Sequence, residues 1–320
     1  MTSSSDRRPP EDDIVIWRYL NDWKFRQLLG KFAEHDKWKP KTDEKVVYKN
    51  EPGQLWFSYP WTYGDDLEGS MPDANKDPKY YCDEMAKRLC LSAEEAEKRK
   101  RHFLSADTQT LQECVLAMAS ICGVSCWHEN NSESRGMWKA FVRKGDGVAI
   151  RTTVGKLIHG LQYAYGSLAK AAKPSLASIK YVNHKDFFLP ADGFRSLLGI
   201  IRKKYSYQNE IRLIAKSPKL SALSTKITRQ VDLNDLEESF RPLKPSEKDQ
   251  YIKSCGEYCA SASEELQDKD ELGFNVPIKL KGLIDELVIK SGSSAEFKDE
   301  VGELLAGVGL GDVAVRESSV

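Results

Sequence analysis

Apolar and polar residues alternate along several short stretches of the chain, and stretches with helical spacing separate them. The alternation predicts strands over residues 13–20, 53–60, 122–127, 147–154 and 178–184. Helical spacing predicts helices over 21–32, 134–145 and 193–205, the last of which leads into a further strand at 204–215. The tail from residue 276 predicts helix, strand, helix, strand. Because strands and helices interleave irregularly, we expect an α+β fold with mixed, mainly antiparallel sheets and flanking helices.

The same pattern suggests how the chain is organised. Residues 1–13 are polar and read as a disordered leader, and residues 14–320 read as a single α+β domain. Within that domain we expect a helical insertion at about 64–110, where Ser92 and Glu95 have the spacing of a capping box. A polar excursion is expected at about 241–272, and 225–240 is read as an additional strand.

Charge and composition narrow the possible partners. Lys and Arg total 48, as do Asp and Glu, so the net charge does not indicate nucleic-acid binding, although a local patch is not excluded. No apolar run has membrane-spanning length, and no signal peptide is evident, so we expect no membrane partner. Seven cysteines without an export signal favour reduced thiols and a cytoplasmic location.

The strand predicted at 204–215 places Gln208, Glu210 and Arg212 on one face. A buried carboxylate is costly unless it has a partner, and Arg212 could supply the counter-charge for Glu210. This polar face is either a solvated outer surface or the floor of a site.

Two residues on the first two predicted strands are further candidates. Arg18 interrupts the apolar run IVIWRYL, where it either extends to the sheet edge or grips an anion. Ser58 ends the second strand, which is a common place for a turn or capping serine. The loop that follows carries Asp65, Asp66 and Glu68, but it lacks the spacing of a calcium loop, and we expect no metal.

Other candidate chemistry has weaker support. Cys122, Cys126 and His128, with Cys255 and Cys259, do not have the usual spacing of zinc ligands, and Cys126 with His102 or His159 lacks a nucleophile signature. Trp138 and Phe141 are expected to share the packing face of one helix. The chain contains no Walker loop, dinucleotide-binding glycine motif, HExxH or nucleophile elbow.

Several segments, taken in order, resemble the bacterial family called domain of unknown function 2971. They are WRYL, LWFSYPWTYGDDLEG, VSCWHE, MWKAF with GDGVAIRTT, IRKKYSYQNEIRL, and LIDELVIKSGSS with VAVRESS. Gln208 stands where that family usually has an acidic residue, and the loop GDDLE lacks its proline. This family name implies no activity.

The order Arg18, Ser58, Gln208-Asn209-Glu210 also resembles ADP-ribosyltransferases of the arginine–serine–glutamate class. That resemblance implies catalytic roles for Arg18, Ser58, Gln208 and Glu210. Glu210 would stabilise the charge that develops on the ribose of NAD. Gln208 would position the acceptor, and Ser58 would orient Arg18 or Glu210. Arg18, Tyr19, Ser58 and Trp138 would bind NAD.

Three functions are therefore expected in order of preference. The first is an NAD-dependent ADP-ribosyltransferase-like enzyme that modifies a macromolecular acceptor or hydrolyses NAD, as in a toxin or a phage-defence effector. The second is a non-catalytic nucleotide-sensing or protein-interaction domain. The third is a metal-dependent nuclease or phosphoesterase that uses Asp65, Asp66, Glu68 and Glu210.

Overall fold

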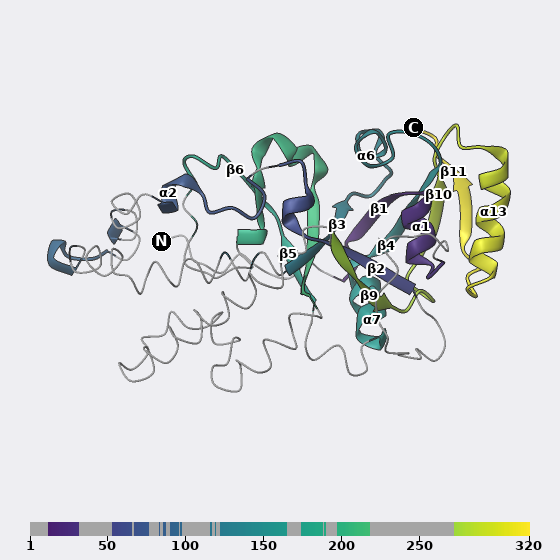
Figure 1. The fold of residues 1–320 in the computed structure, drawn as a ribbon, viewed down its shortest axis with the longest axis horizontal. Coiled ribbons are helices and arrows are strands. Elements are labelled where there is room, and N and C mark those ends of the chain that lie inside the picture. Colours follow the sequence, from purple (N-terminus) through teal and green to yellow (C-terminus); the bar gives the residue numbers. More distant parts are fainter. Residues whose placement is uncertain are drawn as a thin grey trace.

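The computed structural model describes residues 12–31, 53–65, 67–76, 122–164, 174–187, 197–217 and 272–320, with isolated positions between 83 and 119 and at 189. Figure 1 shows its helices and strands. In chain order they are β1 (Val15–Asn21), α1 (Asp22–Leu28), β2 (Gly53–Ser58), η1 (Pro60–Thr62), α2 (Asp73–Lys76), β3 (Cys122–Glu129), α6 (Arg135–Phe141), β4 (Gly147–Thr153), α7 (Val154–Ala164), β5 (Ser175–Ser178), β6 (Lys180–Val182), β7 (Ile200–Arg202), η2 (Lys203–Gln208), β8 (Glu210–Lys216), β9 (Gly273–Ile278), β10 (Glu286–Ile289), α13 (Ala295–Ala306) and β11 (Ala314–Glu317).

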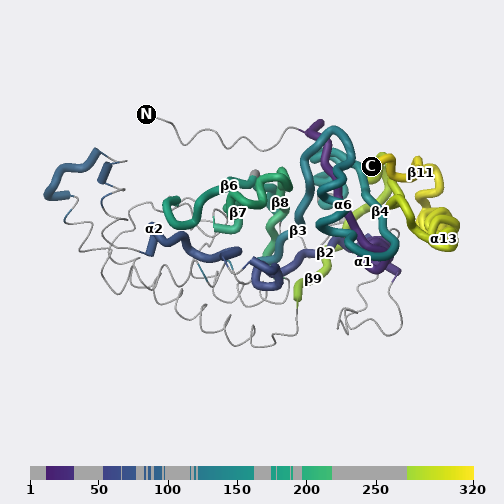
Figure 2. Tube along the Cα trace, turned by 90° about the horizontal axis from the view of Figure 1, so that it is seen from above, coloured from purple at the N-terminus to yellow at the C-terminus, as the bar shows by residue number. Residues whose placement is uncertain are grey.

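Nine of these strands form one mixed sheet. Its main path runs β11-β10-β4-β1-β3-β2-β9, and β8 with β5 joins it through β3. All pairings within it are antiparallel except the parallel pair of β10 with β11. A separate parallel pair, β6 with β7, lies between α2 and the main sheet, on the side away from α13 (Figure 2). The fold is therefore α+β, as the sequence predicts.

The sheet divides at β3, and this division positions the candidate site. β8 pairs with β3 along seven residues and so occupies one edge of that strand. β1 and β2 share the other edge: β1 pairs through Ile16 and Trp17, and β2 through Ser58. Because both strands leave β3 after these few pairs, their backbones diverge. We call the place where they diverge the split.

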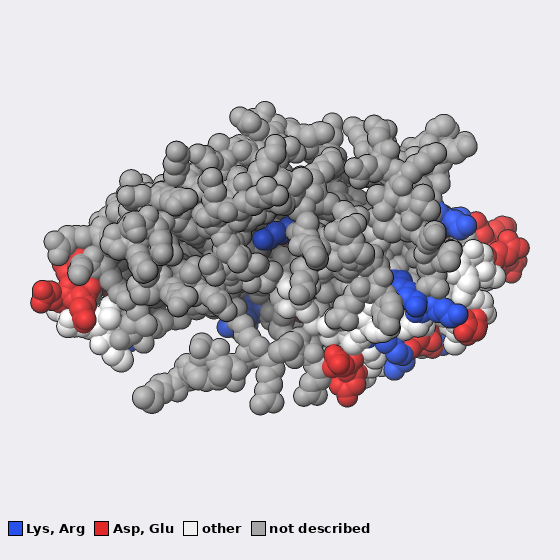
Figure 3. Space-filling view, turned by 90° about the horizontal axis from the view of Figure 1, so that it is seen from below, with Lys and Arg blue, Asp and Glu red and all other residues white. Residues whose placement is uncertain are grey.

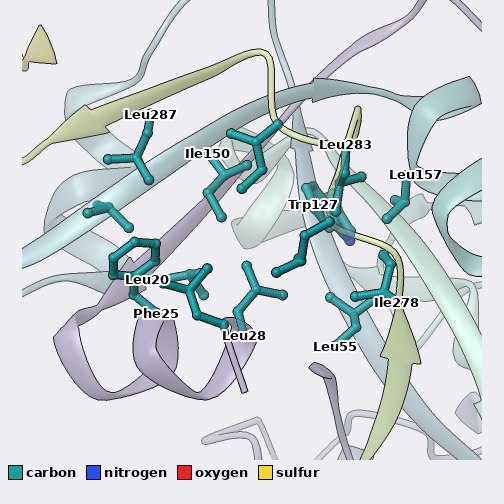
Figure 4. Packing of buried hydrophobic residues seen from close by; sticks show 14 of the residues in the cluster. Leu20, Phe25, Leu28, Leu55, Trp127, Ile150, Leu157, Ile278, Leu283 and Leu287 are labelled. Carbon is teal, nitrogen blue, oxygen red and sulfur yellow. The ribbon is translucent and has the colours of Figure 1, made fainter. Parts of the chain in front are cut away.

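One face of the sheet carries the main hydrophobic core, and we call it the core face. Leu20 and Ile150 come from one side of the split, and Leu55 and Ile278 from the other. Figure 4 shows these residues converging with Phe25 of α1. Helices α7 and α13 also bury apolar residues in this cluster. The core therefore packs against both parts of the sheet, which stabilises both.

The other face, called the second face below, has two smaller apolar clusters. Trp17 and Tyr19 pack there against Trp138 of α6. A second cluster, around Val124 and Ile214, lies beneath β7 and the segment before it. Polar residues of β3 and β8 lie between these two clusters.

Several predicted elements are confirmed, and others are wrong. The strands expected over 13–20, 53–60, 122–127 and 147–154 are present within one or two residues. Residues 193–205 are not one helix, because β7 and the 3-10 helix η2 occupy 200–208. The tail begins with β9 rather than with a helix, and the strand expected at 178–184 is divided between β5 and β6.

Two predicted side-chain positions also need correction. Phe141 does not share the packing face of α6 with Trp138: it is 43% exposed, and Val142 is buried in its place. A solvated outer face at β8 is wrong as well, because Glu210 and Arg212 are 8% and 2% exposed. The capping box at Ser92 and Glu95 is confirmed by reciprocal hydrogen bonds of 2.9 and 3.3 Å.

Some expectations fall outside the described residues. These include most of the leader, nearly all of the excursion at 241–272 and the expected strand at 225–240. No described helix is both long enough and apolar enough to cross a bilayer. Figure 3 shows acidic and basic side chains interspersed near the α13 end of the described surface, in keeping with the balanced total charge.

Candidate functional site

Arg18 spans the split and connects both sides of it. Its register opposite Ile150 places it on the core face, and its guanidinium extends towards β2 and β3. There it donates to the Ser125 hydroxyl and, over 3.1 Å, to the Trp56 carbonyl oxygen. The guanidinium carbon also lies 5.4 Å from the centroid of the Trp127 ring, within cation–π range. Arg18 therefore fixes the geometry of the split.

The partners of Arg18 are all neutral groups. A guanidinium has five N–H donors, and the described residues occupy two of them. Burial lowers the pKa of Arg18 to about 10, so the group remains a cation at neutral pH. Within the described parts of the chain, no carboxylate pairs with it. A half-buried cation with free donors is suited to binding an anion.

A group of ionic residues lies on the second face beside the split. Glu210 and Arg212 stand opposite His128 and Cys126 of β3, and the Arg212 Nε donates to the Glu210 Oε1 over 2.6 Å. Arg212 also donates to Glu68 and, over 2.9 Å, to the Leu198 carbonyl oxygen. One arginine thus neutralises two buried carboxylates.

The pKa shifts in this group follow from burial and charge. Burial opposes the charge of Arg212, but Glu210 and Glu68 outweigh it and raise its pKa well above the usual value. Burial raises the pKa of Glu68, and the contacts with Arg212 oppose that shift. The prediction that Arg212 supplies the counter-charge for Glu210 is confirmed.

Cys126 and Tyr63 connect this ionic group to the split. The Cys126 sulfur lies 3.4 Å from the Tyr63 hydroxyl oxygen, and the Glu210 carboxylate is close enough to raise the pKa of the Cys126 thiol further than burial does. Burial raises the pKa of both groups, which keeps them neutral. Both are close enough to Arg18 to act on its pKa. The split and the ionic group are therefore neighbouring parts of one polar region.

His128 adds an acceptor at the edge of that region. Its Nδ1 contacts the Gln208 carbonyl oxygen, which can only accept, so the proton must sit on Nδ1. Burial lowers the pKa of His128, which favours this neutral form. Nε2 then carries a lone pair and has no partner among the described residues, although the side chain is 4% exposed. The Tyr19 ring lies 6.3 Å away.

The predicted catalytic residues Arg18, Ser58 and Glu210 all lie around β3, but they do not all share a face. Ser58 and Glu210 stand opposite Val124 and His128 and point to the second face. The Ser58 hydroxyl accepts from the Trp56 Nε1 over 2.9 Å, and its expected role of orienting Arg18 or Glu210 remains a prediction. Arg18 reaches the region only through the split.

Gln208 does not extend the polar face of β8. It ends η2, and Asn209 then takes a left-handed conformation with φ of +36° before the strand begins at Glu210. Left-handed geometry is tolerated by Asn. The predicted pairing of Gln208 with Glu210 on one strand face is therefore wrong.

Tyr19 and Trp138 pack together on the second face. Their rings meet edge to face, with centroids 5.0 Å apart. The Tyr19 hydroxyl accepts from the Ser134 amide over 2.7 Å, and the Trp138 Nε1 donates to Glu133 over 3.0 Å. These contacts hold α6 against β1, so a direct role in binding NAD remains a prediction for both residues.

The described carboxylates of the loop after β2 pair with arginines. Asp65 accepts from the Arg202 Nε over 2.8 Å, and Glu68 pairs with Arg212. Asp66 lies outside the described residues. Among the residues that the structure describes, no group of three or more His, Cys, Asp or Glu side chains could hold a metal ion. The geometry gives the metal-dependent hypothesis no support.

Sequence reasoning missed the contacts that assemble this region. Tyr181 supplies its hydroxyl oxygen to the Glu210 amide over 2.6 Å, and Tyr63 reaches Cys126 from the loop after β2. Neither residue stands in a recognisable motif. In the sequence, His128 stands out only as a possible metal ligand. Its Nε2 is free because the Gln208 carbonyl oxygen fixes the proton on Nδ1, and the sequence does not show where that carbonyl lies.

Comparison with known proteins gives no match: no family model fits the chain, and no curated protein or solved structure is significantly similar to it. The two resemblances drawn from the sequence therefore remain predictions.

Proposed function

We propose that this chain is a nucleotide-binding domain that takes NAD or a related nucleotide at the split, with Arg18 holding a phosphate. The observation that carries the proposal is the half-buried Arg18 cation, whose described partners are all neutral. A phosphate oxygen is the ligand that a guanidinium with free donors recognises best. The order of Arg18, Ser58 and Glu210 along the chain gives NAD as the first ligand to test.

Binding without transfer is the form of this function that the geometry supports best. ADP-ribosyl transfer needs a carboxylate aimed at the positive charge that develops on the ribose. Glu210 instead meets Arg212 over 2.6 Å and shares that cation with Glu68. Its charge is already balanced within the protein, which suits a sensor better than a transferase.

ADP-ribosyl transfer is a second candidate, and one observation favours it. Arg18, Ser58 and Glu210 come from three strands that all border β3, and Cys126 connects Glu210 to the vicinity of Arg18. A modest rearrangement that separates Glu210 from Arg212 would place a carboxylate beside a bound nucleotide. Such an enzyme would transfer ADP-ribose to a macromolecular acceptor or to water.

The two candidates are separated by titrating NAD into the protein and measuring nicotinamide release in the same samples. Binding without release supports the sensor, and release that falls on the order of 10²–10³-fold in Glu210→Gln supports the transferase. In both cases we expect Arg18→Gln to weaken NAD binding by about 10- to 100-fold, through the loss of charge-assisted hydrogen bonds.

The matched control is Arg143→Gln, which removes an exposed arginine at the end of α6. This variant should bind NAD like the wild type. Equal NAD affinity in Arg18→Gln and Arg143→Gln, or no binding by the wild type, would overturn the proposal.

A further inference from the structure

Helix α6 and the 3-10 helix η2 lie next to each other at the end of β3. The two elements contact each other directly. They also meet through side chains of the sheet, because Tyr19 packs edge to face on Trp138 of α6 and lies 6.3 Å from His128. His128 in turn contacts the Gln208 carbonyl oxygen at the end of η2. The exposed residues of α6 and η2 therefore belong to one surface.

Every charged side chain of this surface is positive. Arg135 and Lys139 of α6 and Lys203 and Lys204 of η2 are all exposed. Neither element contains an Asp or a Glu. We call these four cations, together with the exposed rings of Phe141 and Tyr207, the basic surface. It is a local excess of positive charge in a chain whose total charge is balanced.

The nearest carboxylates along the chain are already paired. Glu133 comes just before α6 and pairs with Arg316, and Glu210 comes just after η2 and pairs with Arg212. Within the described residues, none of the four cations of the basic surface forms an ion pair. Other exposed or half-buried cations do, as the pairs of Arg26, Lys156 and Lys298 show. The positive charge of the basic surface is therefore available to an external anion.

The placement of these cations is unfavourable within the protein itself. Arg135 and Lys139 are four residues apart on one helix, where like charges repel. Arg135 also lies in the first turn of α6, where a cation opposes the helix dipole. Lys203 and Lys204 are neighbours in η2. A ligand with several negative charges would relieve this repulsion, which a single small anion could do only in part.

The two exposed rings indicate which kind of polyanion fits. Phe141 at the end of α6 is 43% exposed, and Tyr207 in η2 is 56% exposed. Exposed aromatic rings among cations are typical of surfaces that bind single-stranded nucleic acid, because the cations meet phosphates and the rings stack on bases. The paired bases of a duplex are stacked on one another, so they do not offer their faces in this way.

We infer that the basic surface binds single-stranded nucleic acid. Lys203 and Lys204 contact phosphates on the η2 side, and Arg135 and Lys139 contact phosphates on the α6 side. Unpaired bases stack on Phe141 and Tyr207. This activity goes beyond the proposed function, because it uses neither Arg18 nor the split.

The test measures fluorescence anisotropy of labelled oligonucleotides of about 20 residues, a length that exceeds one single-strand site. Single-stranded DNA, single-stranded RNA and the DNA duplex of the same sequence are each titrated with wild-type protein between about 50 and 200 mM salt. We expect the single strands to bind more tightly than the duplex. Four phosphate contacts predict a slope of about −3 for log K against log salt, at about −0.7 for each contact.

Two charge variants test whether both elements take part. Lys203→Gln with Lys204→Gln should weaken single-strand binding by about 10-fold or more and should roughly halve the salt slope. Arg135→Gln with Lys139→Gln should do the same from the α6 side. An affinity and slope equal to those of the wild type in either variant would overturn the inference.

The matched control removes the same charge from another part of the molecule. Lys31 and Lys281 are exposed, and both adjoin the cluster of the core face, next to Leu29 and Leu280. Lys31→Gln with Lys281→Gln should bind single strands like the wild type. A loss equal to that of the η2 variant would show a response to net charge alone and would contradict a site on the basic surface.

A third variant separates nucleic acid from other polyanions. Phe141→Ala with Tyr207→Ala should weaken single-strand binding by about 10-fold or more, through lost stacking, and should leave the salt slope unchanged. Unchanged affinity would show that charge alone is recognised. Duplex bound as tightly as single strands, or vesicles with phosphatidylserine bound by a protein that binds no oligonucleotide, would also overturn the inference. Circular dichroism of all variants checks that they fold.

Discussion

Arg212 is the residue on which the interior of the candidate site most depends. It is 2% exposed and neutralises Glu210 and Glu68, which are buried with it. Such an arrangement contributes little net stability over an apolar core, but removing one member is costly because it leaves unpaired charge. Sequence alternation was enough to predict that Glu210 and Arg212 share a face. It could not predict the contact of Arg212 with Glu68, which lies 144 residues away along the chain.

We predict that Arg212→Met destabilises the protein by about 3–5 kcal/mol, since two carboxylates lose their counter-charge. Urea unfolding measures the change. Arg26→Met is the matched control, because Arg26 pairs with the more exposed Asp22 and Glu300 and should cost about 0–1 kcal/mol.

If Arg212→Met fails to fold, the triple change Arg212→Met, Glu210→Gln, Glu68→Gln should recover most of the stability. If Arg212→Met and Arg26→Met lower the free energy of unfolding equally, the buried pairs of Arg212 with Glu210 and Glu68 do not make the predicted contribution to stability.

Strands of the sheet were easier to predict than the segments around β8. The alternation of apolar residues places β1, β2, β3 and β4 correctly, because each has one face in a core. β8 begins later than predicted because η2 and the left-handed Asn209 precede it. The sequence could not predict the contacts of Arg18 either, because its partners are far away along the chain. Ser125 and Trp56 lie 107 and 38 residues from Arg18.

Close packing around β3 leaves no room for a side chain at Gly123. A Cβ there would lie 2.6 Å from the Phe274 ring and 2.8 Å from the Phe57 Cβ. Those two rings are stacked with centroids 5.6 Å apart, so neither can move freely. We predict that Gly123→Ala destabilises by about 1–3 kcal/mol through overpacking, as measured by thermal and urea unfolding.

Gly302 provides the opposite case for the same substitution. It lies inside α13, and no atom comes within 4 Å of a Cβ placed there. Gly302→Ala should stabilise by about 0.5–1 kcal/mol, because Ala has the higher helix propensity. If Gly123→Ala also stabilises, the packing of β3 against Phe57 and Phe274 is not as tight as described.

The edge strand β11 is held to the rest of the molecule by Glu133. Its carboxylate accepts hydrogen bonds of 2.6 and 3.0 Å from the Ser318 hydroxyl and the Ser319 amide, and it also pairs with Arg316. Burial opposes ionisation, but the hydrogen bonds from Ser318, Trp138 and Ser319 outweigh it and lower the pKa of Glu133 from 4.5 to about 2. The contribution to stability is thus present above about pH 4.5 and is lost as the pH falls towards 2.

We predict that Glu133→Gln loosens β11 without unfolding the core, because an amide cannot accept all of these bonds. The reporter is the Ser318 amide, which donates to the Ile289 carbonyl oxygen over 2.8 Å. Its hydrogen-exchange protection should fall by roughly 10- to 100-fold. Glu303→Gln, on the exposed face of α13, is the control, and equal protection in both variants would contradict the role of Glu133.

At the scale of the whole molecule, the divided sheet brings an apolar core and a polar region close together. Apolar residues from both parts of the sheet pack on the core face. Arg18 then remains a cation whose described partners are all neutral, and the neighbouring ionic group has its own charges paired. This contrast in charge leads to the proposal that an anionic nucleotide binds at the split.

The most direct measurement is a crystal structure of the full chain with NAD. We predict that a phosphate of NAD lies within hydrogen-bonding distance of the Arg18 guanidinium, with the Arg212 pairs intact. NAD bound elsewhere, or a carboxylate from another part of the chain paired with Arg18 in place of the phosphate, would contradict the account.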